Sequence, residues 1–219
     1  MSSGLNPAEV RIPRFDAYER TMHWMSALSF VYAAITGLAI WSPKLYWLGT
    51  ILGGGFVIRG THPWAGVLFS AAMGWMFARW GKTMRLDADD RIWLTKMDKY
   101  ATHQHSALPE SGRFNAGQKL LFWSQALTAL LLFLSGAVLW FPEWMPRALR
   151  LAAIAMHPLA AIGSIAGIIV HVYMGTAAVP HSMRAMLRGY VVPEWGRFHH
   201  PKWYREWRAS NALEKPDGL

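Results

Sequence analysis

The chain has 219 residues, of which 53% are hydrophobic, and its formal net charge is +9. It contains no cysteine, which excludes disulfides, iron–sulfur clusters held by its own thiolates, and covalently attached haem. The positive charge does not require a nucleic-acid partner, because basic residues beside membrane spans meet anionic lipid head groups. Its 13 tryptophans are of a residue type that gathers at membrane–water interfaces.

Four stretches lack Asp, Glu, Lys and Arg, and even the shortest of them, 60–78, has 19 residues. A helix needs about 20 apolar residues to cross about 30 Å of hydrocarbon. A soluble four-helix core would need a polar stripe on every helix, and these segments show none. The sequence therefore predicts an all-α membrane protein built as a four-transmembrane-helix bundle. The expected helices are 22–41, 61–79, 117–140 and 151–178.

Basic residues are divided unevenly between the two sides of these spans. The N-terminal arm, the 79–119 segment and the C-terminal tail hold 18 Lys and Arg, and the other two connections hold four. The positive-inside rule then places both termini, the loop 80–116 and the tail 180–219 in the cytoplasm. We expect a single multi-pass membrane domain over 1–219 in a bacterial inner membrane. The glycine-rich run 49–60 is expected to be an external loop, and the first helix is too long for a signal-peptide core.

Four of the nine histidines fall within the spans: His23, His62, His157 and His171. Ionisable groups at membrane depth are costly and usually functional. His23 and His171 lie near the cytoplasmic side, and His62 and His157 near the external side. His157 and His171 are 14 residues apart, which is about 1400° of helical rotation, so both project from one face. Histidine thus occurs twice in each leaflet, on different helices.

This pattern predicts two b-type haems. An electron-transfer haem takes two axial ligands, neutral imidazole supplies them, and ligands from separate helices hold the ring between them. Pairing by depth gives His23 with His171, and His62 with His157. Small residues on the helix-four face, such as Ser164 and Gly167, leave room for a flat macrocycle, although they also suit plain helix packing. The alternative from another class is a histidine-lined metal or proton transporter, which predicts acidic residues within the spans.

The two external histidines are each followed by proline, in His62-Pro63 and His157-Pro158. We expect each proline in or near the first turn of its helix, where a missing backbone donor costs little. The remaining histidines are expected to be surface or interface residues. They are His103, His105, His181, His199 and His200.

From about Arg14 to Trp207 the chain resembles the cytochrome b (gamma) subunit of membrane-bound respiratory formate dehydrogenases. The string Asn-Ala-Gly-Gln-Lys at 115–119 and the string His-His-Pro-Lys-Trp-Tyr-Arg-Glu at 199–206 are the most specific carriers. Further carriers are Arg20-Thr-Met-His23-Trp24, His62-Pro63, His157 and His171-Val-Tyr-Met174. The histidine spacing alone is shared more widely, with cytochrome b subunits of hydrogenases and related reductases.

The resemblance implies a four-helix bundle with two haem b groups, ligated by the same histidine pairs. It implies a quinone site, for menaquinone or ubiquinone, beside the cytoplasmic haem near Asn115, Gly117 and Gln118. The amides can donate hydrogen bonds to a quinone carbonyl, and glycine lets a ring approach the backbone. Asn115 also suits the position of a helix cap. The implied partners are an external iron–sulfur (beta) subunit and a molybdenum- or tungsten-dependent formate-oxidising (alpha) subunit.

We therefore expect a membrane subunit that passes electrons from the iron–sulfur subunit across the membrane to quinone and does not itself oxidise formate. The nearest alternative is the matching subunit of a hydrogenase or related quinone-linked reductase, or a free-standing quinol-linked cytochrome. No Asp or Glu lies within the four expected helices, which argues against the transporter.

Overall fold

The computed structural model describes residues 11–101, 104 and 107–213. The chain divides into two compact units, which are described separately. The bundle unit comprises Ala17–Trp80 and Trp123–Met174, and it contains the histidines of the spans. The short-helix unit is drawn from 1–16, 81–122 and 175–219.

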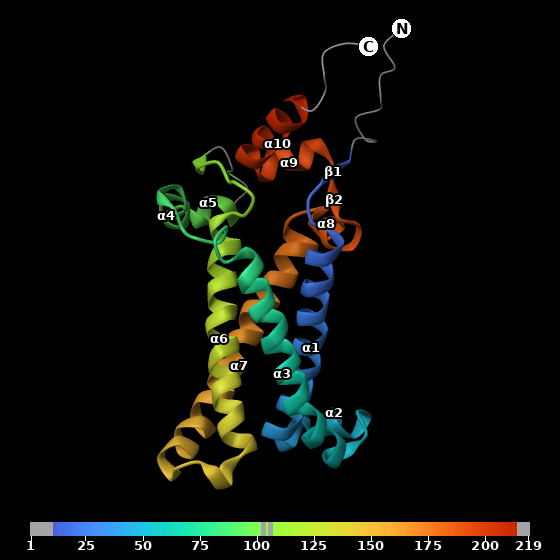
Figure 1. The fold of residues 1–219 in the computed structure, drawn as a ribbon, viewed down its shortest axis with the longest axis vertical. Coiled ribbons are helices and arrows are strands. Elements are labelled where there is room, and N and C mark those ends of the chain that lie inside the picture. The colour runs from blue at the N-terminus through green and yellow to red at the C-terminus, as the bar shows by residue number, and fades with distance from the viewer. Residues whose placement is uncertain (1–10, 102–103, 105–106, 214–219) are drawn as a thin grey trace. The chain divides into compact units, whose positions relative to one another are not determined.

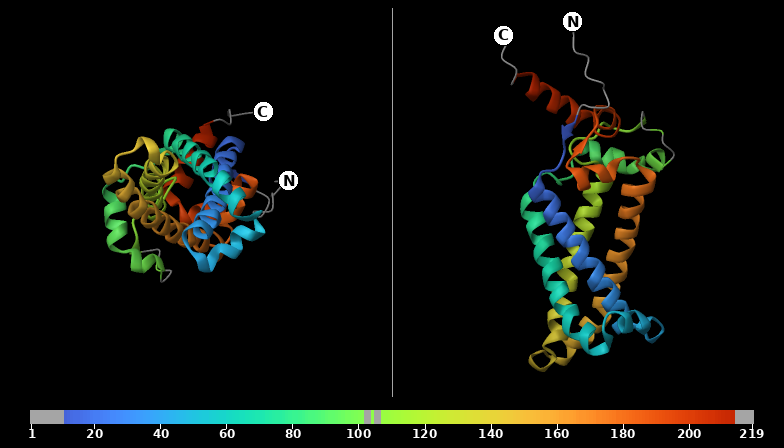
Figure 2. Two further views of the ribbon diagram at one scale, coloured as in Figure 1. Left: turned by 90° about the horizontal axis from the view of Figure 1, so that it is seen from below. Right: turned by 90° about the vertical axis from the view of Figure 1, so that its right-hand side faces the viewer.

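The bundle unit consists of four long helices that lie side by side (Figures 1 and 2). They are α1 (Ala17–Trp41), α3 (Gly54–Trp80), α6 (Ala116–Trp140), of which the part from Trp123 onward belongs here, and α7 (Arg147–Tyr173). Short connections complete it: η2 (Pro43–Leu45), α2 (Tyr46–Ile51) and η4 (Pro142–Trp144). Phe30, Phe69, Met73 and Ala129 form a buried cluster, and Ile165 and Ile168 pack against it. All four long helices therefore share one core.

Besides its apolar core, the bundle unit buries several polar side chains, and its exterior is apolar, unlike that of a soluble bundle. Hydroxyl and amide side chains are buried at Ser26, Ser29, Thr36, Gln125, Ser135 and Ser164. Large apolar side chains are exposed at Leu28, Leu127, Leu130, Ile154, Ile162 and Ile169. A surface of this kind is stable against lipid, where helices associate through small residues and interhelical hydrogen bonds. Among the described residues, three helical segments are long and apolar enough to cross a membrane: Ala17–Trp41, Ala116–Trp140 and Arg147–Ala178.

Helix α3 differs from the sequence prediction in two ways. It begins at Gly54 rather than at 61, so residues 54–60 are helical and are not an external loop. It is not among the segments found apolar enough to span, because its 27 residues include five glycines as well as Arg59 and His62. Its crossing of the membrane therefore remains a prediction.

The two prolines that follow histidines are also placed differently from our expectation. Pro63 lies inside α3 and Pro158 inside α7, beyond the first turn of each helix. Helix α7 begins at Arg147 rather than at 151, and it passes at Met174 into a short π-helix, η5 (Met174–Ala178). An interior proline removes one backbone hydrogen bond, which a membrane bundle tolerates where neighbouring groups compensate.

The short-helix unit gives structure to segments that the sequence analysis treated as loop and tail. The segment 80–116 contains α4 (Ala88–Thr95) and α5 (Met97–Ala101). The tail contains α8 (Ser182–Arg188), α9 (Pro193–His199) and α10 (Pro201–Leu213). Strand β1 (Ile12–Pro13) pairs antiparallel with β2 (Tyr190–Val191). This small ladder is the departure from an all-α fold, and it forms because Ile12 and Val191 are both fully buried there.

The shared core predicts where the bundle unit is sensitive to truncation. Phe69→Ala would open a cavity among the four helices and lower the free energy of unfolding by about 3 kcal/mol or more. Phe133→Ala on α6 is the control, because Phe133 is 46% exposed on the apolar surface whereas Phe69 is 4% exposed. Thermal unfolding of the detergent-solubilised protein would measure both. Equal losses in the two variants would contradict the proposed core.

Candidate functional site

The four histidines of the spans form two close pairs inside the bundle unit. The rings of His62 on α3 and His157 on α7 have centroids 6.1 Å apart, with an interplanar angle of 75°. The rings of His23 on α1 and His171 on α7 have centroids 6.0 Å apart, with an interplanar angle of 54°. These are the two pairs that depth alone predicted.

The spacing within each pair suits two imidazoles that face one metal ion from opposite sides. A metal–imidazole bond is about 2 Å long, which puts the centroids of two such rings about 6 Å apart. Within the part of the chain that the structure describes, no three or more His, Cys, Asp or Glu side chains gather to hold a metal ion. Each pair thus offers two nitrogen ligands, which suits a metal whose other ligands come from a macrocycle.

The rings of the His62–His157 pair are hydrogen-bonded to side chains on neighbouring helices. His62 Nδ1 lies 3.0 Å from Thr36 Oγ1 of α1, and His157 Nδ1 lies 2.9 Å from Ser135 Oγ of α6. In the other pair, the buried Nδ1 of His23 has no hydrogen-bond partner among the described residues. The residue Thr36 was not anticipated from the sequence, since hydroxyl residues in membrane helices commonly bond only to their own backbone.

A buried polar pair lies midway along α7 between its two histidines. Ser164 follows His157 by seven residues and precedes His171 by seven, from the numbering itself. Its hydroxyl donates to Gln125 Oε1 at 2.6 Å, and Gln125 Nε2 donates to the Ser164 carbonyl at 3.1 Å. This reciprocal contact joins α6 to α7 and leaves neither side chain unsatisfied at the centre of the bundle.

The predicted quinone residues lie at the start of α6 in the short-helix unit, where they bond to one another. The Asn115 side chain accepts from the Gln118 backbone N–H at 2.9 Å, and the Gln118 side chain accepts from the Asn115 N–H at 3.0 Å. This is a reciprocal capping box, so the capping role considered for Asn115 is observed. Gly117 packs against the indole of Trp93, which comes within 3.4 Å of where a Cβ would stand.

Tyr100 completes this group of residues. Its side chain is hydrogen-bonded to Asn115. Burial raises the pKa of the phenol despite that bond, so Tyr100 stays protonated at neutral pH and is available as a donor.

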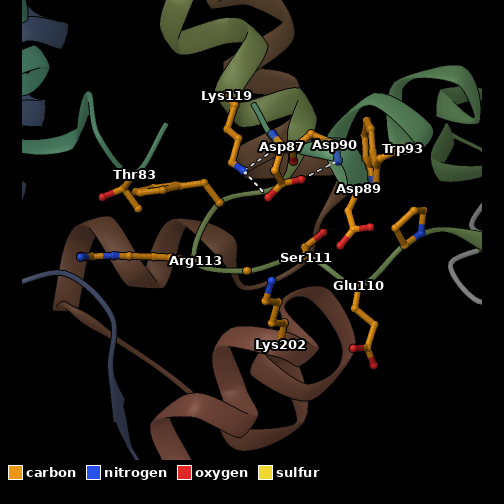
Figure 3. Close-up of a pocket in the computed structure, with 13 residues that line it drawn as sticks. Thr83, Asp87, Asp89, Asp90, Trp93, Glu110, Ser111, Arg113, Lys119 and Lys202 are labelled. Atoms are coloured by element: carbon orange, nitrogen blue, oxygen red, sulfur yellow. Dashed lines mark hydrogen bonds and ion pairs between the residues drawn. The ribbon is translucent and has the colours of Figure 1, made fainter. Parts of the chain in front are cut away.

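A polar cavity of about 170 Å³ lies beside these residues within the short-helix unit (Figure 3). Buried Lys119 projects toward it and forms ion pairs with Asp90 at 2.5 Å and Asp87 at 3.7 Å. The pKa of Asp87 is lowered, chiefly by the hydrogen bond from the Asp90 backbone and further by the charges of Lys119 and Lys202. Other lining residues include Asp89, Glu110 and Arg113. The cavity is therefore lined by charges of both signs.

The remaining histidines divide into three groups. His181 is exposed and His199 is half-buried, as expected for surface and interface residues. His103 and His105 lie outside the described residues. The prediction for His200 was wrong, because this side chain is 2% exposed and its Nδ1 donates to the Gly112 carbonyl at 2.8 Å. Its aromatic neighbours Trp195 and Trp203 enclose it in the core of the short-helix unit.

Residues 14–189 match the family described as prokaryotic cytochrome b561, and that match covers most of the chain. The chain belongs to the prokaryotic cytochrome b561 family. Membership in this family implies haem b, and the paired imidazoles fit such a group, which takes two axial nitrogens and brings its own equatorial ones.

The chain is also similar to cytochrome b556 subunits of formate dehydrogenases. The chain is 35% identical over 203 residues to the cytochrome b556(fdo) subunit of formate dehydrogenase of Escherichia coli, covering 91% of this chain and 94% of that protein. It is 31% identical over 209 residues to the formate dehydrogenase cytochrome b556 subunit of Haemophilus influenzae, covering 94% and 87%. The nitrate-inducible cytochrome b556(Fdn) subunit of Escherichia coli is 29% identical. The predicted resemblance to formate dehydrogenase cytochrome b subunits is confirmed, and this favours a redox subunit over a transporter.

The burial of His200 predicts a pH dependence for this cytochrome. Burial, followed by the charge of Arg14, lowers the pKa of His200 well below its usual value. Below about pH 6.5 this histidine is protonated in the unfolded chain but stays neutral in the folded chain. The free energy of unfolding therefore falls as the pH decreases below about 6.5.

In a comparison of thermal unfolding at about pH 7.5 and about pH 5.5, His200→Gln should reduce the acid destabilisation, because the amide still donates to Gly112 but does not titrate. The exposed His181→Gln is the matched control and should behave as the parent protein does. An undiminished acid effect in His200→Gln would show that other groups cause it.

Proposed function

We propose that this chain is the di-haem, quinone-reactive membrane subunit of a formate dehydrogenase complex. In this proposal it accepts electrons from an iron–sulfur subunit on the external side and passes them across the membrane to quinone on the cytoplasmic side. The observation that carries the proposal is two histidine pairs in the bundle unit with ring centroids 6.0 and 6.1 Å apart, one joining α1 to α7 and the other joining α3 to α7.

Each pair is proposed to hold one haem b, with His23 and His171 as axial ligands of one and His62 and His157 as axial ligands of the other. When bound, haem supplies a one-electron carrier whose two axial positions are filled, which leaves no site for oxygen. The protein contributes the ligating nitrogens, fixes the ring positions from separate helices, and excludes water through the apolar exterior of the bundle. Two such centres placed at successive depths along α7 support an electron path across the membrane.

The same proposal includes the topology of a four-span inner-membrane protein with cytoplasmic termini. Helix α3 is long enough to cross, with 27 residues, at about 1.5 Å of rise per residue. It contributes Phe69 and Met73 to the core that α1 and α6 share. Phe69 and Met73 are both buried in that core, which favours packing of α3 within the bundle despite its lower hydropathy. The bias of Lys and Arg supports the orientation.

The partners are proposed from the relatives. Those proteins are named as subunits of formate dehydrogenases, which supports an external iron–sulfur subunit and a molybdenum- or tungsten-dependent subunit that oxidises formate. The corresponding subunit of a hydrogenase remains the second candidate, because the histidine spacing is shared more widely than the tail motif. Purification from the native membrane, followed by identification of the attached subunits, separates these two.

Quinone is proposed to bind near Asn115, Gly117 and Gln118, with menaquinone and ubiquinone both compatible. The capping box uses only the side-chain oxygens of Asn115 and Gln118 as acceptors. Asn115 also bonds to Tyr100, so the remaining amide N–H groups are the donors that a quinone carbonyl would need. The neighbouring phenol of Tyr100 and the cavity lined by Lys119 and Asp90 add proton-bearing groups to the same unit.

Haem stoichiometry tests the ligand assignment. The purified parent protein should contain two b-type haems per chain in a pyridine haemochrome assay. His62→Ala and His157→Ala should each reduce this to about one, because removal of one axial ligand from a pair releases its haem. His181→Ala, which removes an exposed histidine, is the control and should retain both. A colourless parent protein from haem-replete cells would overturn the cytochrome assignment.

The quinone residues can be tested without disturbing the helix cap. Asn115→Asp and Gln118→Glu keep the acceptor oxygens of the capping box but remove the amide donors. Loss of a hydrogen bond worth about 1.4 kcal/mol should raise the KM for a soluble quinone analogue about tenfold. Thermal unfolding, measured in parallel, should be nearly unchanged. An unaltered KM in both variants would limit these residues to capping.

A further inference from the structure

Two of the four histidines are supported by the same local arrangement, repeated on different helices. His62 on α3 faces Thr36-Gly37 of α1, and His157 on α7 faces Ser135-Gly136 of α6. In each case a hydroxyl residue contacts Nδ1 and the glycine that follows it contacts the adjacent ring carbon. The two supporting dipeptides come from α1 and α6, the two long helices that contribute no histidine to this pair.

The hydrogen bonds of each hydroxyl select one tautomer of the imidazole that it contacts. The hydroxyl of Thr36 donates its single proton to the Tyr32 carbonyl at 2.7 Å, so its oxygen can only accept from His62 Nδ1. The ring of His62 is also hydrogen-bonded to the backbone of Ala33, whose carbonyl is likewise only an acceptor. Nδ1 therefore carries the hydrogen, and Nε2 keeps its lone pair.

The second ring repeats this logic. The hydroxyl of Ser135 donates to the Leu131 carbonyl at 2.6 Å and accepts from His157 Nδ1 at 2.9 Å. His157 is also hydrogen-bonded to the backbone of Leu132. In both helices the carbonyl involved belongs to the residue three positions before the hydroxyl. Nε2 of His157 is thus also left with its lone pair for a metal.

The glycines fix where each ring can lie. A Cβ on Gly37 would come within 3.0 Å of His62 Cε1, and a Cβ on Gly136 would come within 3.3 Å of His157 Cε1. Contacts this short require the ring to move. The two imidazoles therefore rest directly against the backbone of α1 and α6.

We propose that Thr36-Gly37 and Ser135-Gly136 are matched positioning elements that hold His62 and His157 as Nδ1–H tautomers and lower the midpoint potential of the haem that this pair holds. The inference rests on the proposed function. An acceptor at Nδ1–H makes Nε2 a more basic ligand, which favours the ferric state. The buried Nδ1 of His23 has no such acceptor among the described residues, so the His23–His171 centre should have the higher potential of the two.

Redox titration of the purified complex, with the two haems resolved, tests this directly. The haem that is lost in His62→Ala identifies the signal of the His62–His157 centre. Thr36→Val and Ser135→Ala should each move the midpoint of that haem to a more positive potential and leave the other midpoint unchanged. The double variant should lose haem from this centre about tenfold more readily. Thr36→Ser, which keeps a hydroxyl at this position, should leave the midpoint close to that of the parent.

Two matched controls separate this role from the bond each hydroxyl makes to its own helix. Thr128 donates to the carbonyls of Ser124 and Gln125 at 3.0 and 3.2 Å, which is the backbone pattern of Thr36 without a histidine. Ser29 has the same relation to Met25 and Ser26. Thr128→Val and Ser29→Ala should leave both midpoints in place.

Gly37→Ala tests the glycine contact, with Gly74→Ala as its control because a Cβ at Gly74 meets nothing within 4 Å. Displacement of His62 should change the electron paramagnetic resonance spectrum of the ferric haem at this centre, and the control spectrum should match the parent. If two haems are present but neither midpoint moves in Thr36→Val or Ser135→Ala, the positioning role is wrong while the cytochrome assignment stands. If the parent protein holds no haem, the proposed function itself fails.

Discussion

Inside hydrocarbon a polar side chain must find its partner within the protein, and this requirement organises the bundle unit. Thr36 bonds to His62, Ser135 bonds to His157, and Gln125 bonds to Ser164 on the next helix. Each contact satisfies a buried polar group and also joins two helices. Because lipid provides no hydrophobic drive toward helix association, such contacts and close packing of small residues supply the specificity. The same bonds that stabilise the bundle therefore also determine where the imidazoles lie.

The sequence was sufficient to predict the two histidine pairs because helical geometry relates position to depth and direction. His157 and His171 are in phase on one helix, and single histidines on two other helices match them in depth. The sequence was not sufficient for Thr36 or Ser135, since a hydroxyl in a membrane helix satisfies itself on its own backbone in most sequences. Whether it also contacts a ring depends on the rotation and approach of the neighbouring helix, which no local pattern records.

The errors at helix boundaries and at His200 both arise where tertiary packing overrides a local sequence signal. Glycine-rich sequence after Gly54 was interpreted as loop because glycine has a low helix propensity, but tertiary context overrides that propensity and α3 begins at Gly54. Pro63 was expected in a first turn for the same reason. His200 was assigned to the surface or an interface because it lies in the tail, beyond the predicted spans. Its burial depends instead on the indoles of Trp195 and Trp203 and on the Gly112 carbonyl, which only the folded unit brings together.

The arrangement also explains the contribution of the long helix that carries no histidine in its span. Helix α7 provides a ligand to both proposed haem centres, so its rotation and depth affect the two together. Helix α6 holds α7 at two points, through Ser135 at His157 and through Gln125 at Ser164. Without α6 the ring of His157 would lose the acceptor that selects its tautomer, and the middle of α7 would expose an unpaired hydroxyl to lipid. Helices α1, α3 and α7 carry the proposed ligands, and α6 is needed to keep α7 in register.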